Sequence, residues 1–238
     1  MATKRVKIKV KKKKINSKKI IITIVFLLVI GFFVAYTLKL PVKNIYISGN
    51  KLVRDREIIE LAHLENYPPF ISTFFNNIEK NISKHDYIKE VTVTRKFFNK
   101  IYINIEEYKP LCIYNDKVLL SSSKQVDNIY NIDYLPYITN DITAVKEEFV
   151  KQFSKVNNDV LLKISHLEYA PNEVDKERFL LYMVDKNYVY ITLPKISKIN
   201  KYNSIAKELE DKRGVIYLDS GDYVEIKNAK KEETKDES

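Results

Sequence analysis

The sequence has few of the residues from which catalytic and metal sites are usually built. It contains one cysteine, three histidines and four glycines among 238 residues. The single cysteine, Cys112, excludes an intramolecular disulfide and a cysteine-rich zinc site. The glycines never fall in the order of a GxGxxG or GxxxxGK[ST] phosphate loop. We therefore expect no metal, no cofactor and no small-molecule ligand.

Most of the chain also lacks an excess of charge of either sign. The sequence holds 41 Lys and Arg against 31 Asp and Glu, a formal net charge of +10. Residues 1–19 contain ten of the basic residues and no acidic one, which leaves 31 of each sign in the remainder. A nucleic-acid-binding domain would carry its excess charge on the folded part. The sequence therefore predicts no nucleic-acid partner, and it predicts a basic arm at 1–19.

The stretch from Ile20 to Leu38 contains no charged residue. A helix of this length spans about 28 Å, close to the roughly 30 Å hydrocarbon core of a bilayer. A buried core helix would keep a polar face, and a cleaved signal peptide has an apolar region of only about 7–15 residues. We expect one uncleaved transmembrane helix over 20–40. The positive charges before it predict a cytoplasmic N-terminus and external domains after it. Two alternatives stay open for the basic arm. It either serves only to set the membrane topology, or it also contacts anionic lipid headgroups.

Residues 41–110 predict a small β-α-α-β-β unit. Alternation over 42–47 favours a strand, and Gly49-Asn50 is a turn signal. Two helices are expected next, one after Asp55 and one capped by Ser72 or Thr73, the latter with Phe74, Phe75, Ile78 and Ile82 on one face. Two further strands follow at 88–95 and 101–106, and Pro110 ends the unit.

These motifs, in this order and directly after one membrane span, resemble the FtsQ/DivIB family of bacterial division proteins. The GN turn, the segment IKEVTVTR at 88–95, the alternating IYINI and the closing Glu107-Tyr108-Lys109-Pro110 resemble a POTRA domain. The resemblance implies an α+β fold, with a mixed β domain and flanking helices after the POTRA domain. It also implies a divisome scaffold at the septum, without enzymatic activity.

Residues 111–227 are expected to form that β domain. The sequence predicts a hairpin over 111–120 with its turn at 114–117, where the glycine usual in the family is missing. Helices are expected at about 143–156 and 196–211, the second ending at Gly214. Strands are expected at 161–169, 178–184 and 188–193, and a terminal hairpin at 215–226. Residues 228–238 are charged and are expected to be disordered.

The terminal strand at 223–226 is expected to leave an open sheet edge, to which a partner strand can add. In the FtsQ/DivIB family, which this sequence resembles, this region holds the membrane-anchored partners FtsL and DivIC, or FtsB in some bacteria. The same residues also fit an ordinary terminal hairpin, and that alternative stays open. The candidate contacts carried over by position are Tyr217, Asp219, Tyr223, Val224 and Glu225.

Two other functions compete with a division scaffold. A secretion or outer-membrane assembly component also carries POTRA units, but too few residues follow here for a membrane β-barrel. An exported cysteine transpeptidase would need an activated thiolate. Cys112 lies in a short apolar strand with no nucleophile signature, so it is expected to be a packing residue. Glu106 and Glu107 are strand neighbours that point to opposite faces, and they cannot act as an acid–base pair.

Overall fold

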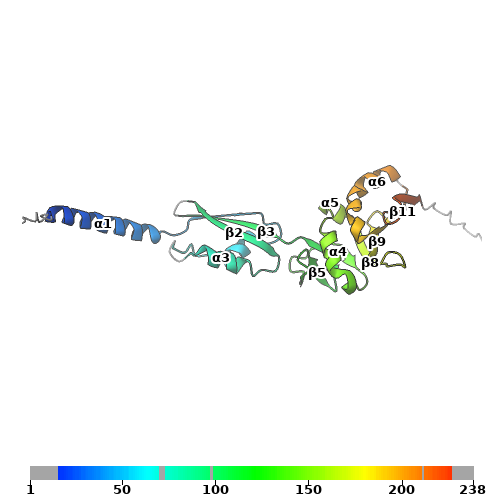
Figure 1. Cartoon of the computed structure of the whole chain (residues 1–238), viewed down its shortest axis with the longest axis horizontal. Coiled ribbons are helices and arrows are strands. Elements are labelled where there is room, and N and C mark those ends of the chain that lie inside the picture. The colour runs from blue at the N-terminus through cyan, green and yellow to red at the C-terminus, as the bar shows by residue number, and fades with distance from the viewer. Residues whose placement is uncertain (1–15, 70–72, 97–98, 211, 227–238) are drawn as a thin grey trace, which may run out of the picture.

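The computed structural model describes residues 16–69, 73–96, 99–210 and 212–226. Most of the expected basic arm and the whole segment 228–238 lie outside these residues. A long helix, a unit with a three-stranded sheet and a unit with a nine-stranded sheet follow one another along the long axis of the molecule (Figure 1). We call the two sheet-containing parts the small unit and the large unit.

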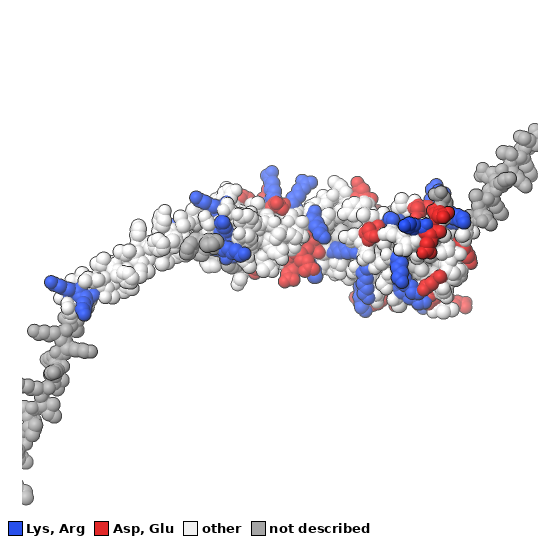
Figure 2. All heavy atoms as spheres, turned by 90° about the horizontal axis from the view of Figure 1, so that it is seen from above, with Lys and Arg blue, Asp and Glu red and all other residues white. Residues whose placement is uncertain are grey.

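Helix α1 (Ser17–Leu38) is largely apolar and contains no buried residue. Its 22 residues are long and apolar enough to cross a membrane. The helix begins earlier than expected, so Lys18 and Lys19 belong to its first turn. Figure 2 shows these basic side chains at the start of the helix and none along it, whereas both signs of charge are mixed over the two units. Eight of the ten basic residues of the expected arm lie outside the described residues, so the prediction of a basic arm is not tested here.

The small unit is a three-stranded sheet covered by two helices. The strand order is β1-β3-β2, with β1 (Asn44–Ser48) parallel to β3 (Lys100–Glu107) and β2 (Ile88–Lys96) antiparallel to it. Helices α2 (Asp55–Leu61) and α3 (Phe75–Ile82) contact each other, and α3 packs on β2. Their apolar residues meet those of β3 in the core, as the periodicity predicted. The element order β-α-α-β-β is confirmed.

Two local predictions in the small unit were incomplete. Phe74 is the N-cap of α3 and is 65% exposed, so it does not share the buried face of Ile78 and Ile82. Ser72, one of the two expected caps, lies outside the described residues. The N-cap position of α3 is Phe74, one residue after Thr73, and the Thr73 hydroxyl accepts a hydrogen bond from the Arg95 guanidinium. This contact ties the segment before α3 to β2.

The large unit is one mixed sheet with the order β12-β11-β10-β9-β8-β7-β4-β5-β6. Most neighbouring strands are antiparallel, whereas the pairs β10/β11, β4/β7 and β7/β8 are parallel. The strands are β4 (Pro110–Tyr114), β5 (Lys117–Leu120), β6 (Gln125–Val126), β7 (Tyr137–Ile138), β8 (Ile164–Tyr169), β9 (Arg178–Met183), β10 (Tyr188–Thr192), β11 (Gly214–Tyr217) and β12 (Tyr223–Ile226).

Helices cover one face of this sheet. Phe149 of α4 (Lys146–Phe153) lies against Phe179 of β9, with ring centroids 5.2 Å apart, and both rings are buried. The 3-10 helix η3 (Leu193–Lys201) contacts α4 and β10 and continues into α6 (Tyr202–Leu209). The single helix expected at 196–211 is therefore divided in two. Short elements η2 (Thr143–Val145) and α5 (Asn158–Leu161) precede α4 and β8, so the strand expected from residue 161 begins only at Ile164.

Two turns correct the sequence interpretation. The hairpin between β4 and β5 needs no glycine, because Asn115 and Asp116 both adopt positive φ, at 51° and 60°. Asn and Asp tolerate that conformation better than other side chains do. Gly214 does not end α6, which terminates at Glu210. It opens β11, where an added Cβ would lie 2.5 Å from the Glu225 carbonyl oxygen, so glycine is required for close approach of β12.

Candidate functional site

The C-terminal edge of the large sheet is the first candidate site. β12 lies at the end of the sheet order and pairs with β11 on one side only, within the described residues. The register places Tyr217 opposite Tyr223 and Val215 opposite Glu225. A strand at the end of a sheet presents backbone N–H and C=O groups that a further strand can pair with. The described residues therefore contain an edge of the kind expected from the sequence.

Side chains of β12 alternate between the two faces of the sheet. Val224 is half-buried and packs against the core, while Tyr223 and Glu225 are exposed on the opposite face. Tyr223 stacks on Tyr217 with ring centroids 4.6 Å apart, and the Tyr217 hydroxyl donates a hydrogen bond of 3.2 Å to Glu225. Three of the five candidate residues, Tyr217, Tyr223 and Glu225, thus form one contiguous patch, and Val224 lies on the other face of the sheet.

The fifth candidate, Asp219, occupies a different environment. Its side chain is only 4% exposed and forms an ion pair of 2.6 Å with Arg178. Burial raises the pKa of Asp219, but hydrogen bonds from Arg178 and Ser220 outweigh this effect, and the pKa is lowered overall. Lys195 donates a hydrogen bond to the Asp219 backbone oxygen. Asp219 therefore holds the turn between β11 and β12 in place.

Sequence reasoning missed two residues beside this patch. Tyr190 of β10 stacks on Tyr217, with centroids 5.4 Å apart, and the Arg178 guanidinium lies 3.8 Å above the Tyr190 ring. The tyrosines at alternating positions 188 and 190 were a signal for one shared face. The hairpin of β9 and β10 across residues 185–187 was expected from the sequence, but the stacking of Tyr190 on Tyr217 depends on the pairing of β10 with β11, which lie far apart in sequence.

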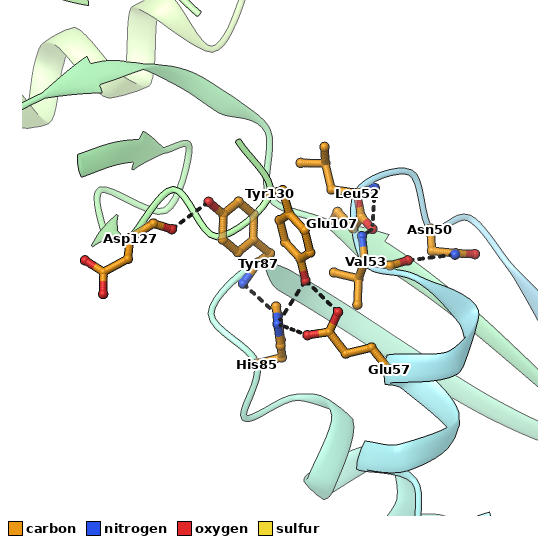
Figure 3. A network of polar contacts seen from close by, with 9 residues as sticks. All are labelled: Asn50, Leu52, Val53, Glu57, His85, Tyr87, Glu107, Asp127 and Tyr130. Carbon is orange, nitrogen blue, oxygen red and sulfur yellow. Dashed lines mark hydrogen bonds and ion pairs between the residues drawn. The ribbon is translucent and has the colours of Figure 1, made fainter. Parts of the chain in front are cut away.

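The joint between the two units is a second polar cluster (Figure 3). Glu57 of α2 contacts His85 Nε2 through one oxygen at 3.0 Å and accepts a hydrogen bond from the Tyr130 hydroxyl through the other at 3.0 Å. The Tyr87 backbone N–H donates to His85 Nδ1, which leaves the proton on Nε2 to be shared with Glu57. The Tyr87 hydroxyl donates to the Asp127 carbonyl at 3.1 Å. Side chains of both units therefore meet in one network.

Glu107 holds the strand-to-helix turn next to this joint. Its carboxylate accepts hydrogen bonds from the backbone N–H groups of residues 51–53, at 2.9 to 3.1 Å. Its neighbour Glu106 points elsewhere and pairs with Lys89 at 2.6 Å. The two carboxylates thus serve separate structural contacts, as their alternation in a strand predicted. This role of Glu107 was not anticipated.

The single cysteine of the chain lies at neither site. Cys112 is fully buried in β4, and burial raises the pKa of its thiol well above the ordinary value, so the reactive thiolate is disfavoured. No three His, Cys, Asp or Glu side chains cluster as metal ligands among the residues that the structure describes. What both sites offer instead is backbone pairing, aromatic surface and a fixed domain joint, which suit protein binding.

Comparisons with known proteins identify the family of the chain. Residues 40–108 match the model of the FtsQ-type POTRA domain. DivIB of Bacillus subtilis (strain 168) is 29% identical over 98% of this chain and 93% of its own length. DivIB of Bacillus anthracis is 30% identical over 90% of this chain and 85% of its own length. The solved extracytoplasmic domain of DivIB from Geobacillus stearothermophilus overlaps 44% of this chain and 96% of that domain, at 19% identity and a TM-score of 0.37, which by itself fixes nothing about the fold. The identity and coverage of the full-length relatives show that the chain belongs to the DivIB family of cell division proteins.

Proposed function

We propose that the chain is a non-catalytic, single-pass membrane scaffold of the division machinery. It binds FtsL-like and DivIC-like (or FtsB-like) partners outside the membrane and helps to assemble the septal peptidoglycan machinery. Family membership supports a role in division. The outer side of β12, which pairs with no other strand among the described residues, is the observation that carries the binding mode, because an edge strand with exposed side chains on one face is suited to strand addition.

The binding site in this proposal is the β12 edge, with the patch of Tyr217, Tyr223 and Glu225 on one face and Val224 on the other, and with Asp219 positioning the turn that carries it. Main-chain hydrogen bonds along β12 would provide affinity, and the side chains would select the partner. Tyr190 stacks on the Tyr217 ring, and the Arg178 guanidinium lies over the Tyr190 ring, so these two residues help to keep the Tyr217 ring in place. Such binding needs no chemical step.

A co-purification experiment tests this binding mode. The full chain in detergent is mixed with the tagged external domains of the FtsL-like and DivIC-like proteins of the same organism. Tyr223→Lys is expected to weaken capture by tenfold or more, because it removes the outermost ring and adds a charge to the patch. Tyr134→Lys, at a tyrosine that is also about half exposed but lies outside the β11–β12 hairpin, is the matched control. Equal capture by wild type and Tyr223→Lys would refute the edge as the binding site.

Two cell experiments test membrane topology and location. Protease added to cells without a wall should digest residues 41–238 and leave the basic arm, because the arm and helix α1 predict a cytoplasmic N-terminus. Protection of residues 41–238 would contradict this topology. A fluorescent fusion should concentrate at mid-cell, and a uniform envelope signal would argue against a division role.

The secretion alternative is less well supported, since the full-length relatives are named as cell division proteins. The transpeptidase alternative would require Cys112 to reach a substrate, and its side chain is fully buried.

A further inference from the structure

The uncovered face of the large sheet carries rows of aromatic rings that cross the strands. In the row nearest the edge, Tyr190, Tyr217 and Tyr223 are register partners on β10, β11 and β12. Their rings stack at 5.4 and 4.6 Å, with interplanar angles of 21° and 14°. A second row continues across the sheet through register partners on β7, β8, β9 and β10, namely Tyr137, His166, Tyr182 and Tyr188.

The first row stops at β12 with one side of its last ring uncovered. Tyr223 contacts Tyr217 on the inner side and is 44% exposed. At the inner end of the same row, the Arg178 guanidinium lies 3.8 Å above the Tyr190 ring. The row therefore already contains a cation stacked on a tyrosine, a contact favoured by the negative face of the aromatic ring.

The second row reaches β12 at Glu225. Tyr188 of β10 is the register partner of Val215 on β11, and Val215 is the register partner of Glu225 on β12. The Glu225 side chain is exposed and accepts a hydrogen bond from the Tyr217 hydroxyl of the neighbouring strand β11. Within residues 16–69, 73–96, 99–210 and 212–226, no Lys or Arg forms an ion pair with Glu225. A residue added directly opposite this position would meet a carboxylate.

The other face of β12 is aliphatic. Val224 packs against the core, while Ile226 on the same face is 48% exposed. A strand beside β12 would therefore meet Tyr223 and Glu225 on one face and Val224 and Ile226 on the other, because strand side chains alternate between the faces.

From this register we infer the chemistry of the strand that β12 accepts: an alternating segment with basic or aromatic residues on one face and aliphatic residues on the other. A Lys or Arg lies opposite Glu225, an Arg or an aromatic ring lies opposite Tyr223, and Val, Ile or Leu lie opposite Val224 and Ile226. The inference rests on the proposed function, since it takes β12 to be an acceptor edge. It adds that the partner segment is basic, which main-chain pairing alone does not require.

Selection from a random peptide library tests this specificity. The full chain is held in lipid nanodiscs and exposed to phage-displayed random 12-residue peptides. The same selection is run on Glu225→Lys, and on Glu173→Lys as a control with the same change of net charge at an exposed loop residue. Wild type and the control should enrich peptides in which Lys or Arg alternates with aliphatic residues, and Glu225→Lys should enrich Asp or Glu instead. Opposite charges across strands stabilise and like charges destabilise, so matched and mismatched peptides should differ in affinity by about tenfold.

Hydrogen exchange separates this inference from the proposed function. Enriched peptides should slow the exchange of amides in residues 223–226. Peptides that leave those amides unprotected would refute β12 as an acceptor. Peptides that protect β12 but show no basic bias, or the same bias with Glu225→Lys, would overturn the inferred chemistry alone. If Glu225→Lys shows an altered thermal melt, Glu225→Gln takes its place and should abolish the basic bias; a bias that persists would count against the inference.

Discussion

Tyr130 of the large unit donates its hydroxyl hydrogen bond to the Glu57 carboxylate of the small unit at 3.0 Å, across 73 residues of sequence. Its ring also packs edge-on against Tyr87, with centroids 5.0 Å apart. Burial and the neighbouring Glu57 raise the pKa of Tyr130, so the hydroxyl remains protonated as a donor at neutral pH. The joint between the units is thus a set of directed contacts as well as a chain connection.

Removing the Tyr130 hydroxyl should loosen this joint. Tyr130→Phe keeps the ring and deletes a hydrogen bond to a charged group, which costs about 1–2 kcal/mol of the free energy of unfolding in a partly buried setting. Distances between spin labels on the two units should broaden in the variant. Tyr134→Phe, an exposed tyrosine on the same segment, is the control and should change neither measurement. An unchanged distance distribution in Tyr130→Phe would show that the hydroxyl does not hold the units together.

The ion pair between Arg178 and Asp219 should be important for the stability of the C-terminal hairpin. Arg178→Ala leaves the Asp219 carboxylate buried without its cation, which costs roughly 3 kcal/mol or more in urea unfolding. Lys198→Ala removes an exposed pair with Asp222 and should cost less than about 1 kcal/mol. Equal losses in the two variants would mean that the Arg178 pair is not the stronger contact.

Asp141 should make the stability of the large unit fall in acid. Hydrogen bonds from Thr143 and Tyr114 lower the pKa of Asp141 to about 2, from an ordinary value of 3.8. Because the folded-state pKa is the lower one, the stabilisation is complete above about pH 4 and is lost as the pH falls towards 2. Urea midpoints measured between pH 5 and 2 should show this loss. Asp141→Asn should flatten that part of the profile, and an unchanged slope would contradict the assignment.

Cys112 should be unreactive in the folded protein. Its side chain is fully buried and its pKa is raised by that burial, so little thiolate forms at neutral pH. A thiol reagent such as DTNB should label it only in denaturant, with a rate that follows unfolding. Rapid labelling under native conditions would reopen the possibility of a catalytic cysteine.

The sequence by itself determined the elements whose signals are local. An uncharged run predicts α1, alternating β-branched residues predict β2 and β3, and spacing of three to four predicts the buried faces of α2 and α4. Each of these predictions depends on residues that are close together in the sequence, so the hydrophobic pattern of one segment is enough to identify the element. The terminal hairpin and its position as an edge were predicted in the same way, and the resemblance to a known family followed from the order of these local motifs.

Only the tertiary structure decided which residues lie beside one another across the sheet and across the joint. Arg178, Tyr190 and Asp219 meet because β9, β10 and β11 are neighbours, and Tyr130 reaches Glu57 because two units meet. The requirement for glycine at position 214 could not be predicted from nearby residues either. It arises because the Glu225 carbonyl of β12 occupies the place where a Cβ would lie. Long-range pairing depends on the packing of the whole chain. The sequence therefore identified the edge strand, while the fold decided that Asp219 supports the patch and that Glu225 faces outward without a cation among the described residues.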